Sequence, residues 1–153
     1  MIVYFSSRQS AMIEAVGYQR LMKAKSYNSD TEKRLYKDRA GVAGEIGLLH
    51  HLGLDISSWN ALWNYELPDV DRYEVRTSVL NQPALYVPFD RVAKNPDQIW
   101  VLAWTDDPLV RVDLLGWARA SYIEGWGFYD HQKRLYRLPE ADLMPMSELE
   151  SAL

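Results

Sequence analysis

The chain has 153 residues, of which 48% are hydrophobic and 25% charged, and its formal net charge is −4. This length and composition predict a single globular domain over residues 1–153 with a sizeable core, and they exclude wholesale disorder. The absence of cysteine excludes disulfide bonds and thiolate zinc sites, and no apolar run reaches the roughly 18–20 residues of a membrane-spanning helix. We therefore expect a cytoplasmic protein that makes no membrane contact.

Two helices are expected in the first third of the chain. Apolar residues recur at three- and four-residue steps over residues 8–25, which predicts an amphipathic helix. Ser29 and Glu32 have capping-box spacing and favour a second helix over residues 30–52. Gly53 is placed to end this helix, since glycine is the usual residue just beyond a helix C-terminus.

The rest of the chain favours strands. Short β-favouring segments separated by turn residues cover 61–65, 72–79, 84–87, 99–104, 109–118 and 135–138. They place the sheet within residues 61–138 and leave a polar tail, residues 139–153, with room for a helical turn. Two helices followed by a meander of about five or six strands predict a single domain of the α/β (α+β) class.

One predicted strand carries an acid and a base on the same face. Because side chains alternate along a strand, Glu74 and Arg76 point to one side, whereas Tyr73 and Val75 point to the other. Two charged residues opposite two apolar residues are consistent with a strand that lines a cleft.

Asp69 precedes this strand, and a hairpin-like bend between Pro68 and Tyr73 would bring its carboxylate near Glu74. Two carboxylates that close repel each other, and a bound divalent cation relieves the repulsion. The three histidines are too few and too far apart for a histidine cage, so oxygen ligands and therefore Mg²⁺ or Mn²⁺ are expected. Asp71 competes with Asp69 for this role, but the Pro-Asp context and the room for a bend favour Asp69.

A third acid, Glu45, lies within the apolar stripe of the second helix, close to Val42 and Ile46. A carboxylate that faces a core is costly unless it is paired or coordinated, although a position at the edge of the stripe would let it reach water. Gly44 and Gly47 lower helix propensity, and a close approach of this slim helix to a sheet would compensate for that cost.

Together these motifs resemble the PD-(D/E)XK nuclease superfamily, whose core carries a helix acid, a Pro-Asp and an acid-x-Lys strand. The matching residues here are Gly44-Glu45, Pro68-Asp69 and Glu74-Val75-Arg76. The chain is more narrowly similar to small phage-encoded members with a Glu-Val-Arg strand, a later Gly-Trp strand end at Gly116-Trp117, and a closing tail at residues 143–149.

The resemblance implies a restriction-endonuclease-like fold, with a central mixed sheet of about five strands flanked by helices, and metal-dependent hydrolysis of phosphodiester bonds in DNA. It makes Asp69 and Glu74 the principal Mg²⁺ (or Mn²⁺) ligands, together with the backbone carbonyl of Val75. Glu45 would act on the same or a second ion, directly or through water. Such small nucleases often need two copies to cut both strands, which implies a possible homodimer.

Arg76 departs from the family pattern, because it stands where the family usually has lysine. Arginine stays charged and grips phosphate well, whereas lysine can shift its pKa and act on water. The resemblance covers about residues 40–150 and, with this departure, implies that Arg76 stabilises the reacting phosphate rather than serving as a base. A phage-encoded enzyme of this kind would act in the host cytoplasm.

Other interpretations stay open. One alternative is a cross-strand ion-pair ladder without function, formed by Asp71, Arg72, Glu74 and Arg76. A catalytically inactive module of the same fold would bind nucleic acid or a host protein, as Arg76 and the net negative charge suggest. A third option is an inhibitor that acts through its acidic surface on a host protein.

Two further segments combine charge with possible nucleic-acid contact. The second predicted helix carries a basic patch, which is either a solvated face or a site for the DNA backbone; its members are Lys33, Arg34, Lys37 and Arg39. The basic-aromatic segment 126–134 either packs against the sheet edge or contacts a nucleic acid.

Overall fold

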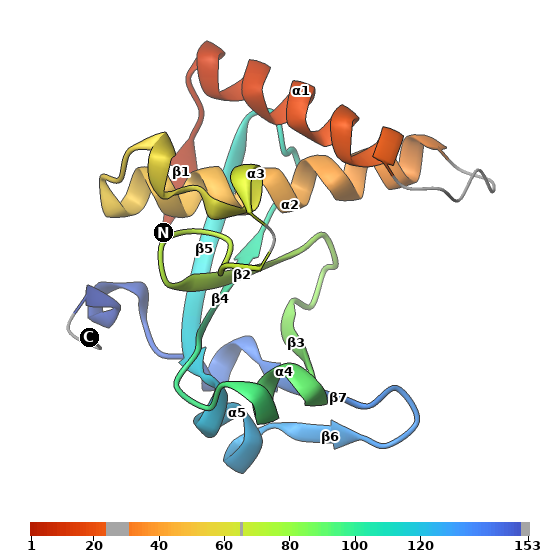
Figure 1. The fold of residues 1–153 in the computed structure, drawn as a ribbon, viewed down its shortest axis with the longest axis vertical. Coiled ribbons are helices and arrows are strands. Elements are labelled where there is room, and N and C mark those ends of the chain that lie inside the picture. Colours follow the sequence, from red (N-terminus) through yellow and green to blue (C-terminus); the bar gives the residue numbers. More distant parts are fainter. Residues whose placement is uncertain (24–30, 65, 151–153) are drawn as a thin grey trace.

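Two sheets and five helices make up the fold, which a computed structural model describes for residues 1–23, 31–64 and 66–150 (Figure 1). The helices are α1 (Ser7–Lys23), α2 (Thr31–Leu52), α3 (Asn60–Trp63), α4 (Phe89–Lys94) and α5 (Ala120–Trp126). The strands are β1 (Ile2–Tyr4), β2 (Tyr73–Ser78), β3 (Ala84–Pro88), β4 (Ile99–Trp104), β5 (Arg111–Arg119), β6 (Phe128–Asp130) and β7 (Leu135–Pro139).

The strands form a four-stranded sheet in the order β1-β5-β4-β2 and a three-stranded sheet in the order β3-β7-β6. The larger sheet is mixed, because β2 and β4 run parallel while the pairs β4–β5 and β1–β5 are antiparallel. The smaller sheet is antiparallel throughout. β2 is an edge strand, and this position matters for the candidate site.

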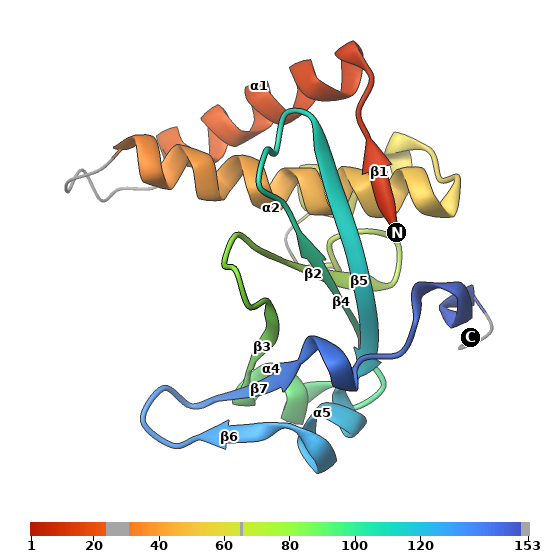
Figure 2. The same cartoon turned by 180° about the vertical axis from the view of Figure 1, so that it is seen from behind.

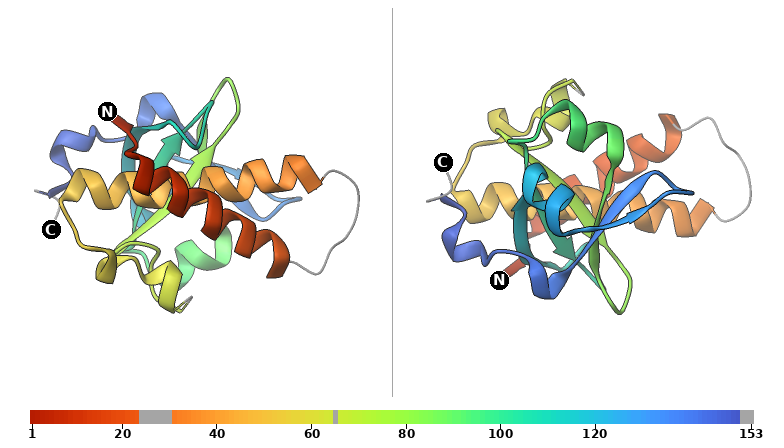
Figure 3. Two further views of the ribbon diagram at one scale, coloured as in Figure 1. Left: turned by 90° about the horizontal axis from the view of Figure 1, so that it is seen from above. Right: turned by 90° about the horizontal axis from the view of Figure 1, so that it is seen from below.

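The larger sheet lies between helices α1 and α2 on one side and the smaller sheet on the other. Figures 2 and 3 show this arrangement from behind and from both ends. Alternate residues of β4 supply the two cores: Val101 packs in the core under α2, and Trp100 in the core shared with the smaller sheet. This alternation follows from the two-residue period of a strand. Both faces of β4 are therefore buried, which explains its continuous apolar sequence.

Helix α2 approaches the sheet closely at its two inner glycines. A Cβ at Gly44 would collide with Oγ1 of Thr77 and lie 3.2 Å from Cγ1 of Val75. A Cβ at Gly47 would collide with a methyl group of Val112. The predicted close approach is confirmed, and it places Glu45 beside β2.

The two predicted helices are confirmed as α1 and α2, although residues 24, 25, 29 and 30 of those predictions lie outside the described residues. Gly53 ends α2 as expected. It adopts a φ of 63°, and its N–H donates to the carbonyl of His50 at 3.1 Å. This left-handed conformation is the one in which glycine is favoured.

The strand expected over residues 61–65 is wrong. Residues 60–63 form α3, and residue 65 lies outside the described part. The preceding turn begins where the Asp55 carboxylate accepts a hydrogen bond from the N–H of Ser57 at 2.9 Å. Trp59, fully buried, then fixes the start of α3 against the core. These local contacts favour helical turns over an extended strand.

The single meander of about five strands is also wrong in its arrangement, although the α+β class and the mixed sheet are confirmed. The segments predicted at 84–87 and 135–138 are strands, but they pair with each other in the smaller sheet. β3 and α4 carry the chain from β2 to the parallel β4, so these neighbours are not consecutive. The short β1, β6, α4 and α5 were not expected.

The tail is less polar than its sequence suggests. It carries 3₁₀ turns at Glu140–Asp142 and Met146–Glu148, and Leu149 is fully buried in the core under α2. Trp117 and Met144 exchange two backbone hydrogen bonds of 3.0 and 2.8 Å, which tie the tail to β5. Residues 151–153 lie outside the described part. No helix in residues 1–23, 31–64 and 66–150 has the length and apolar character that crossing a bilayer requires.

Candidate functional site

A tight bend carries Asp69 to the edge of the four-stranded sheet. Val70 and Tyr73 exchange two backbone hydrogen bonds of 3.0 and 2.8 Å, so the chain reverses across the two residues between them. The bend predicted between Pro68 and Tyr73 is therefore present. Asp71 takes a φ of 50° at its tip, a conformation that aspartate tolerates better than most residues.

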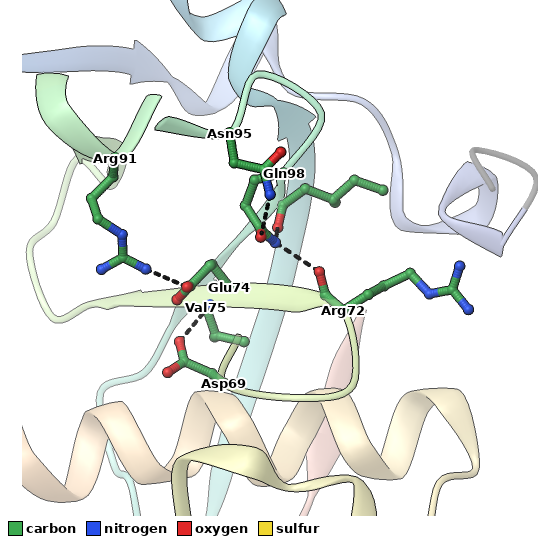
Figure 4. Close-up of polar contacts among 8 residues, drawn as sticks. Asp69, Arg72, Glu74, Val75, Arg91, Asn95 and Gln98 are labelled. Carbon is green, nitrogen blue, oxygen red and sulfur yellow. Dashed lines mark hydrogen bonds and ion pairs between the residues drawn. The ribbon is translucent and has the colours of Figure 1, made fainter. Parts of the chain in front are cut away.

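The Asp69 carboxylate binds the backbone of β2. Its Oδ2 accepts a hydrogen bond from the N–H of Val75 at 2.9 Å (Figure 4). Because β4 pairs with the other side of β2, this N–H faces the open edge of the sheet. The N–H and C=O of one strand residue point to the same edge, so the Val75 carbonyl also faces the side on which Asp69 lies.

Glu74 projects from the face of β2 that looks toward the smaller sheet. Its side chain is almost entirely buried and forms an ion pair with Arg91 of α4 (Figure 4). Arg76 shares this face, as expected, and its guanidinium lies 5.2 Å from the ring centre of Trp100. Arg91 lies 5.3 Å from the same ring. One indole therefore supports both cations near the acid.

Asp69 lies close enough to Glu74 to perturb its titration. The pKa of Glu74 is raised to about 7, first by burial and then by the charge of Asp69 and hydrogen bonding between the two carboxyl groups. Arg91 and Arg76 lower the pKa, but not enough to cancel these effects. The negative charge of Asp69 therefore disfavours ionisation of Glu74.

Glu45 lies on the other side of β2 and has partners of its own. Arg20 donates to both of its oxygens, at 3.3 Å to Oε1 and 2.7 Å to Oε2, and Nε1 of Trp59 donates to Oε2 at 2.9 Å. Burial raises the pKa of Glu45, Arg20 lowers it, and the charge of Asp69 raises it. The expectation that a carboxylate in the apolar stripe needs partners is met by an arginine and an indole.

Asp69, Glu45 and Arg76 line a common cleft of about 410 Å³. We call it the acid cleft; its lining residues are Arg20, Gly41, Glu45, Ala61, Asp69, Val75, Arg76 and Thr77. Glu74 instead lines a neighbouring cavity of about 270 Å³ that also contains Arg91 and Trp100. Asp69 therefore lines the acid cleft, and its carboxyl group lies near Glu74 of the neighbouring cavity.

The predicted acids thus divide into a pair and a separate residue. Asp69 lies near enough to Glu74 to raise its pKa, whereas the oxygens of Glu45 accept hydrogen bonds from Arg20 and Trp59. Within residues 1–23, 31–64 and 66–150, no group of three or more histidine, aspartate or glutamate side chains is arranged to hold a metal ion. Any ion here would be held by the pair, the Val75 carbonyl and non-protein ligands.

Asp71 lies away from this pair. Its half-exposed carboxylate contacts the Nε atom of its neighbour Arg72 at 3.3 Å. Because Glu74 pairs with Arg91 from α4, the charges of β2 are not arranged as the cross-strand ladder considered above. Of the two candidate aspartates, Asp69 is the one that contacts β2.

Three residues of the site were not predicted from the sequence: Arg20, Trp59 and Arg91. Arg20 lies among the basic residues of α1. The one signal for its role was the buried Glu45 on α2, because a buried acid needs a cationic partner. Trp59 was hidden in a segment expected to precede a strand. Arg91 lies on the unexpected α4, so nothing local pointed to it.

Comparisons with protein-family models, with curated proteins and with solved structures gave no match to this chain. Function is therefore inferred from the geometry of the site.

Proposed function

We propose that this protein hydrolyses phosphodiester bonds in DNA with the help of Mg²⁺ or Mn²⁺. The observation that carries the proposal is the Asp69 carboxylate bound to the Val75 N–H at an open sheet edge, with the buried Glu74 beside it and Arg76 on the same strand. A buried acid with a raised pKa beside a second, half-buried acid, next to a cleft lined by an arginine, is the arrangement expected of a functional site. The resemblance to PD-(D/E)XK nucleases supports the same residues.

The residues fit a hard divalent cation. Magnesium is usually bound by one or two carboxylates together with water and substrate phosphates, so a site with fewer than three acids suffices. Asp69, Glu74 and the Val75 carbonyl are all oxygen donors at one edge of β2. A cation bound there would offset the repulsion that raises the pKa of Glu74, polarise the scissile phosphate and acidify the attacking water.

The chain's own residues orient and stabilise the substrate. The N–H of Val75 holds Oδ2 of Asp69 at the edge of β2. Arg76 lines the acid cleft and rests on Trp100, so its permanent charge is available to a phosphate oxygen. We assign Arg76 to stabilising the negative charge of the pentacovalent phosphate.

Glu45 has a different part in this proposal. To act on an ion directly it would have to exchange Arg20 or Trp59, because both of its oxygens accept hydrogen bonds from them. A contribution through water leaves those bonds in place. The backbone around Trp59 is tied to the bend that carries Asp69, since the N–H of Ala61 donates to the Asp69 carbonyl at 3.1 Å.

The test is cleavage by the purified protein of plasmid, linear and branched DNA over a range of Mg²⁺ and Mn²⁺ concentrations. Asp69→Asn keeps an acceptor for the Val75 N–H and removes the charge, so cleavage should fall more than about a hundredfold, since even changes around metal ligands cost 10–100-fold. Asp71→Asn is the matched control, because asparagine also tolerates a positive φ. Equal activity of the two variants would overturn the proposal.

A second candidate function is a catalytically inactive module that binds nucleic acid or a host protein. The observation that favours it is that Glu45 and Glu74 already have arginine partners, Arg20 and Arg91. In that case DNA binding would persist without cleavage at any metal concentration. Under either function we propose a cytoplasmic location, which is the host cytoplasm if the protein is phage-encoded. A homodimer is tested by light scattering with and without DNA.

A further inference from the structure

The outer face of the three-stranded sheet carries an aromatic-arginine-aromatic row. In the strand register Tyr86 of β3 is opposite Arg137 of β7, and Arg137 is opposite Phe128 of β6. Residues opposite each other in antiparallel strands share one face of the sheet, so the three side chains lie side by side. We call Tyr86, Arg137 and Phe128 the aromatic row.

The row is exposed although its neighbours are buried. Tyr86 and Phe128 are 41% and 71% exposed, whereas Val87 and Leu138 on the opposite face of the sheet are fully buried. In the basic-aromatic segment 126–134, Tyr129 packs on Phe89 and Tyr136, so packing accounts for that residue and not for Phe128. Large exposed aromatic side chains grouped on one face mark an interaction surface.

The row continues into the acid cleft. Tyr86 lines a second cleft, of about 340 Å³, together with Lys37, Ser78 and Leu80. Arg76 and Thr77 line both this cleft and the acid cleft, so the two are adjacent. The β6–β7 hairpin and the N-terminal part of α2, where Lys37 lies, extend to the same side of the molecule (Figures 1 and 2).

The charge along this path is positive on a protein whose net charge is −4. Lys37 and Arg76 line the second cleft, no acidic residue of the described part lines it, and Nε of Arg137 donates to the hydroxyl of Tyr86 at 3.3 Å. Aromatic faces alternating with cations suit unpaired bases and phosphates. A purely apolar partner would leave these cations buried and unpaired.

We propose that the aromatic row and the second cleft bind single-stranded nucleic acid and direct its backbone toward Asp69 and Glu74. Bases stack on Phe128 and Tyr86, and the phosphates lie against Arg137, Lys37 and Arg76. A duplex is excluded as the preferred ligand because its bases are already stacked on one another. The direction toward the acids rests on the proposed nuclease function, whereas binding at the row does not.

Binding is measured by fluorescence anisotropy with labelled oligothymidylate and oligouridylate of about 16 nucleotides, a length that one such surface spans. EDTA is present throughout, so the measurement is independent of cleavage. Phe128→Ala should weaken binding roughly 5- to 100-fold, the effect of losing one stacked base, and Phe128→Trp should retain it. Equal affinity for a duplex of the same length would overturn the proposal.

The matched control is Tyr4→Ala, which removes an equally exposed aromatic ring, 64% exposed, from β1 of the other sheet. Its affinity should equal that of the unmodified protein. If Phe128→Ala and Tyr4→Ala bind alike, the row is not the site, even if DNA is cleaved. If Phe128→Ala loses binding but no metal concentration gives cleavage, the row stands and the nuclease function fails. A difference between the two oligonucleotides distinguishes DNA from RNA.

Discussion

Two regions on opposite sides of β2 hold buried glutamates, and they differ in how the charge is balanced. Glu45 and Glu74 are 5% and 7% exposed, so their burial is almost equal. Glu45 has an arginine and an indole on its two oxygens, whereas Glu74 has one half-exposed arginine and a second acid against it. Burial alone therefore does not identify a metal ligand. Asp69 raises the pKa of both acids, but Glu74 has fewer partners to offset that charge, so under the proposed function a cation would act at Glu74.

We expect Glu45 to stabilise the fold, and replacing it should give the largest change in stability. Glu45→Gln removes the negative charge that Arg20 neutralises inside the protein and should lower the free energy of unfolding by about 3–5 kcal/mol. Chemical denaturation measures this. Glu14→Gln is the control, since the exposed Glu14 lies 3.7 Å from Arg39 and should change stability by less than about 0.5 kcal/mol. A stable Glu45→Gln protein without cleavage would instead move Glu45 into the metal site.

The tight packing of α2 against that side gives the next effect. Gly44→Ala places a methyl group against Oγ1 of Thr77 and Cγ1 of Val75, so it should lower stability by about 1–3 kcal/mol. Gly125→Ala is a suitable control, because nothing lies within 4 Å of the added Cβ. If Gly44→Ala is as stable as its control, α2 does not sit as close to β2 as described.

The free energy of unfolding should depend on pH through Glu74. The folded-state pKa of about 7 exceeds the ordinary value of 4.5, so the folded protein holds the proton more tightly than the unfolded chain. The resulting stability is complete below pH 4.5 and disappears as the pH rises to about 7. Without metal, the unfolding free energy should fall across this window, by at most about 1.4 kcal/mol per pH unit.

Glu74→Gln should flatten that dependence relative to the unmodified protein, and Mg²⁺ added above pH 7 should restore stability only when Glu74 is present. Thermal melts at a series of pH values, with and without metal, measure both effects. An unchanged pH profile in Glu74→Gln would mean that the pKa of Glu74 is not raised in the folded protein.

The smallest effect expected is on the competition between Arg91 and a metal. Arg91→Gln removes the partner that a cation must replace at Glu74, so Mn²⁺ affinity at pH 8 should rise a few-fold, which corresponds to less than about 1 kcal/mol. Calorimetric titration measures it. Weaker Mn²⁺ binding in this variant would show that Arg91 helps to build the site instead of competing for it.

The sequence was informative where contacts are local. The period of apolar residues gave α1 and α2, Gly53 gave the end of α2, and the Pro-Asp bend placed Asp69 beside β2. Partners distant in the chain were not predictable, because Arg20 is 25 residues from Glu45 and Arg91 is 17 residues from Glu74. The second sheet was missed for the same reason, since its strands pair across the whole second half of the chain.

The hydrogen bond from the Val75 N–H to Asp69 has a consequence for self-association. An uncovered outer strand offers its backbone groups to a strand from another molecule, and proteins commonly protect such strands with charge or a covering loop. Asp69 does both, since its carboxylate occupies the N–H at the middle of β2. Replacing it by alanine would free that group for intermolecular strand pairing, so the carboxylate that would hold a cation also keeps neighbouring copies of the chain from adding to the sheet.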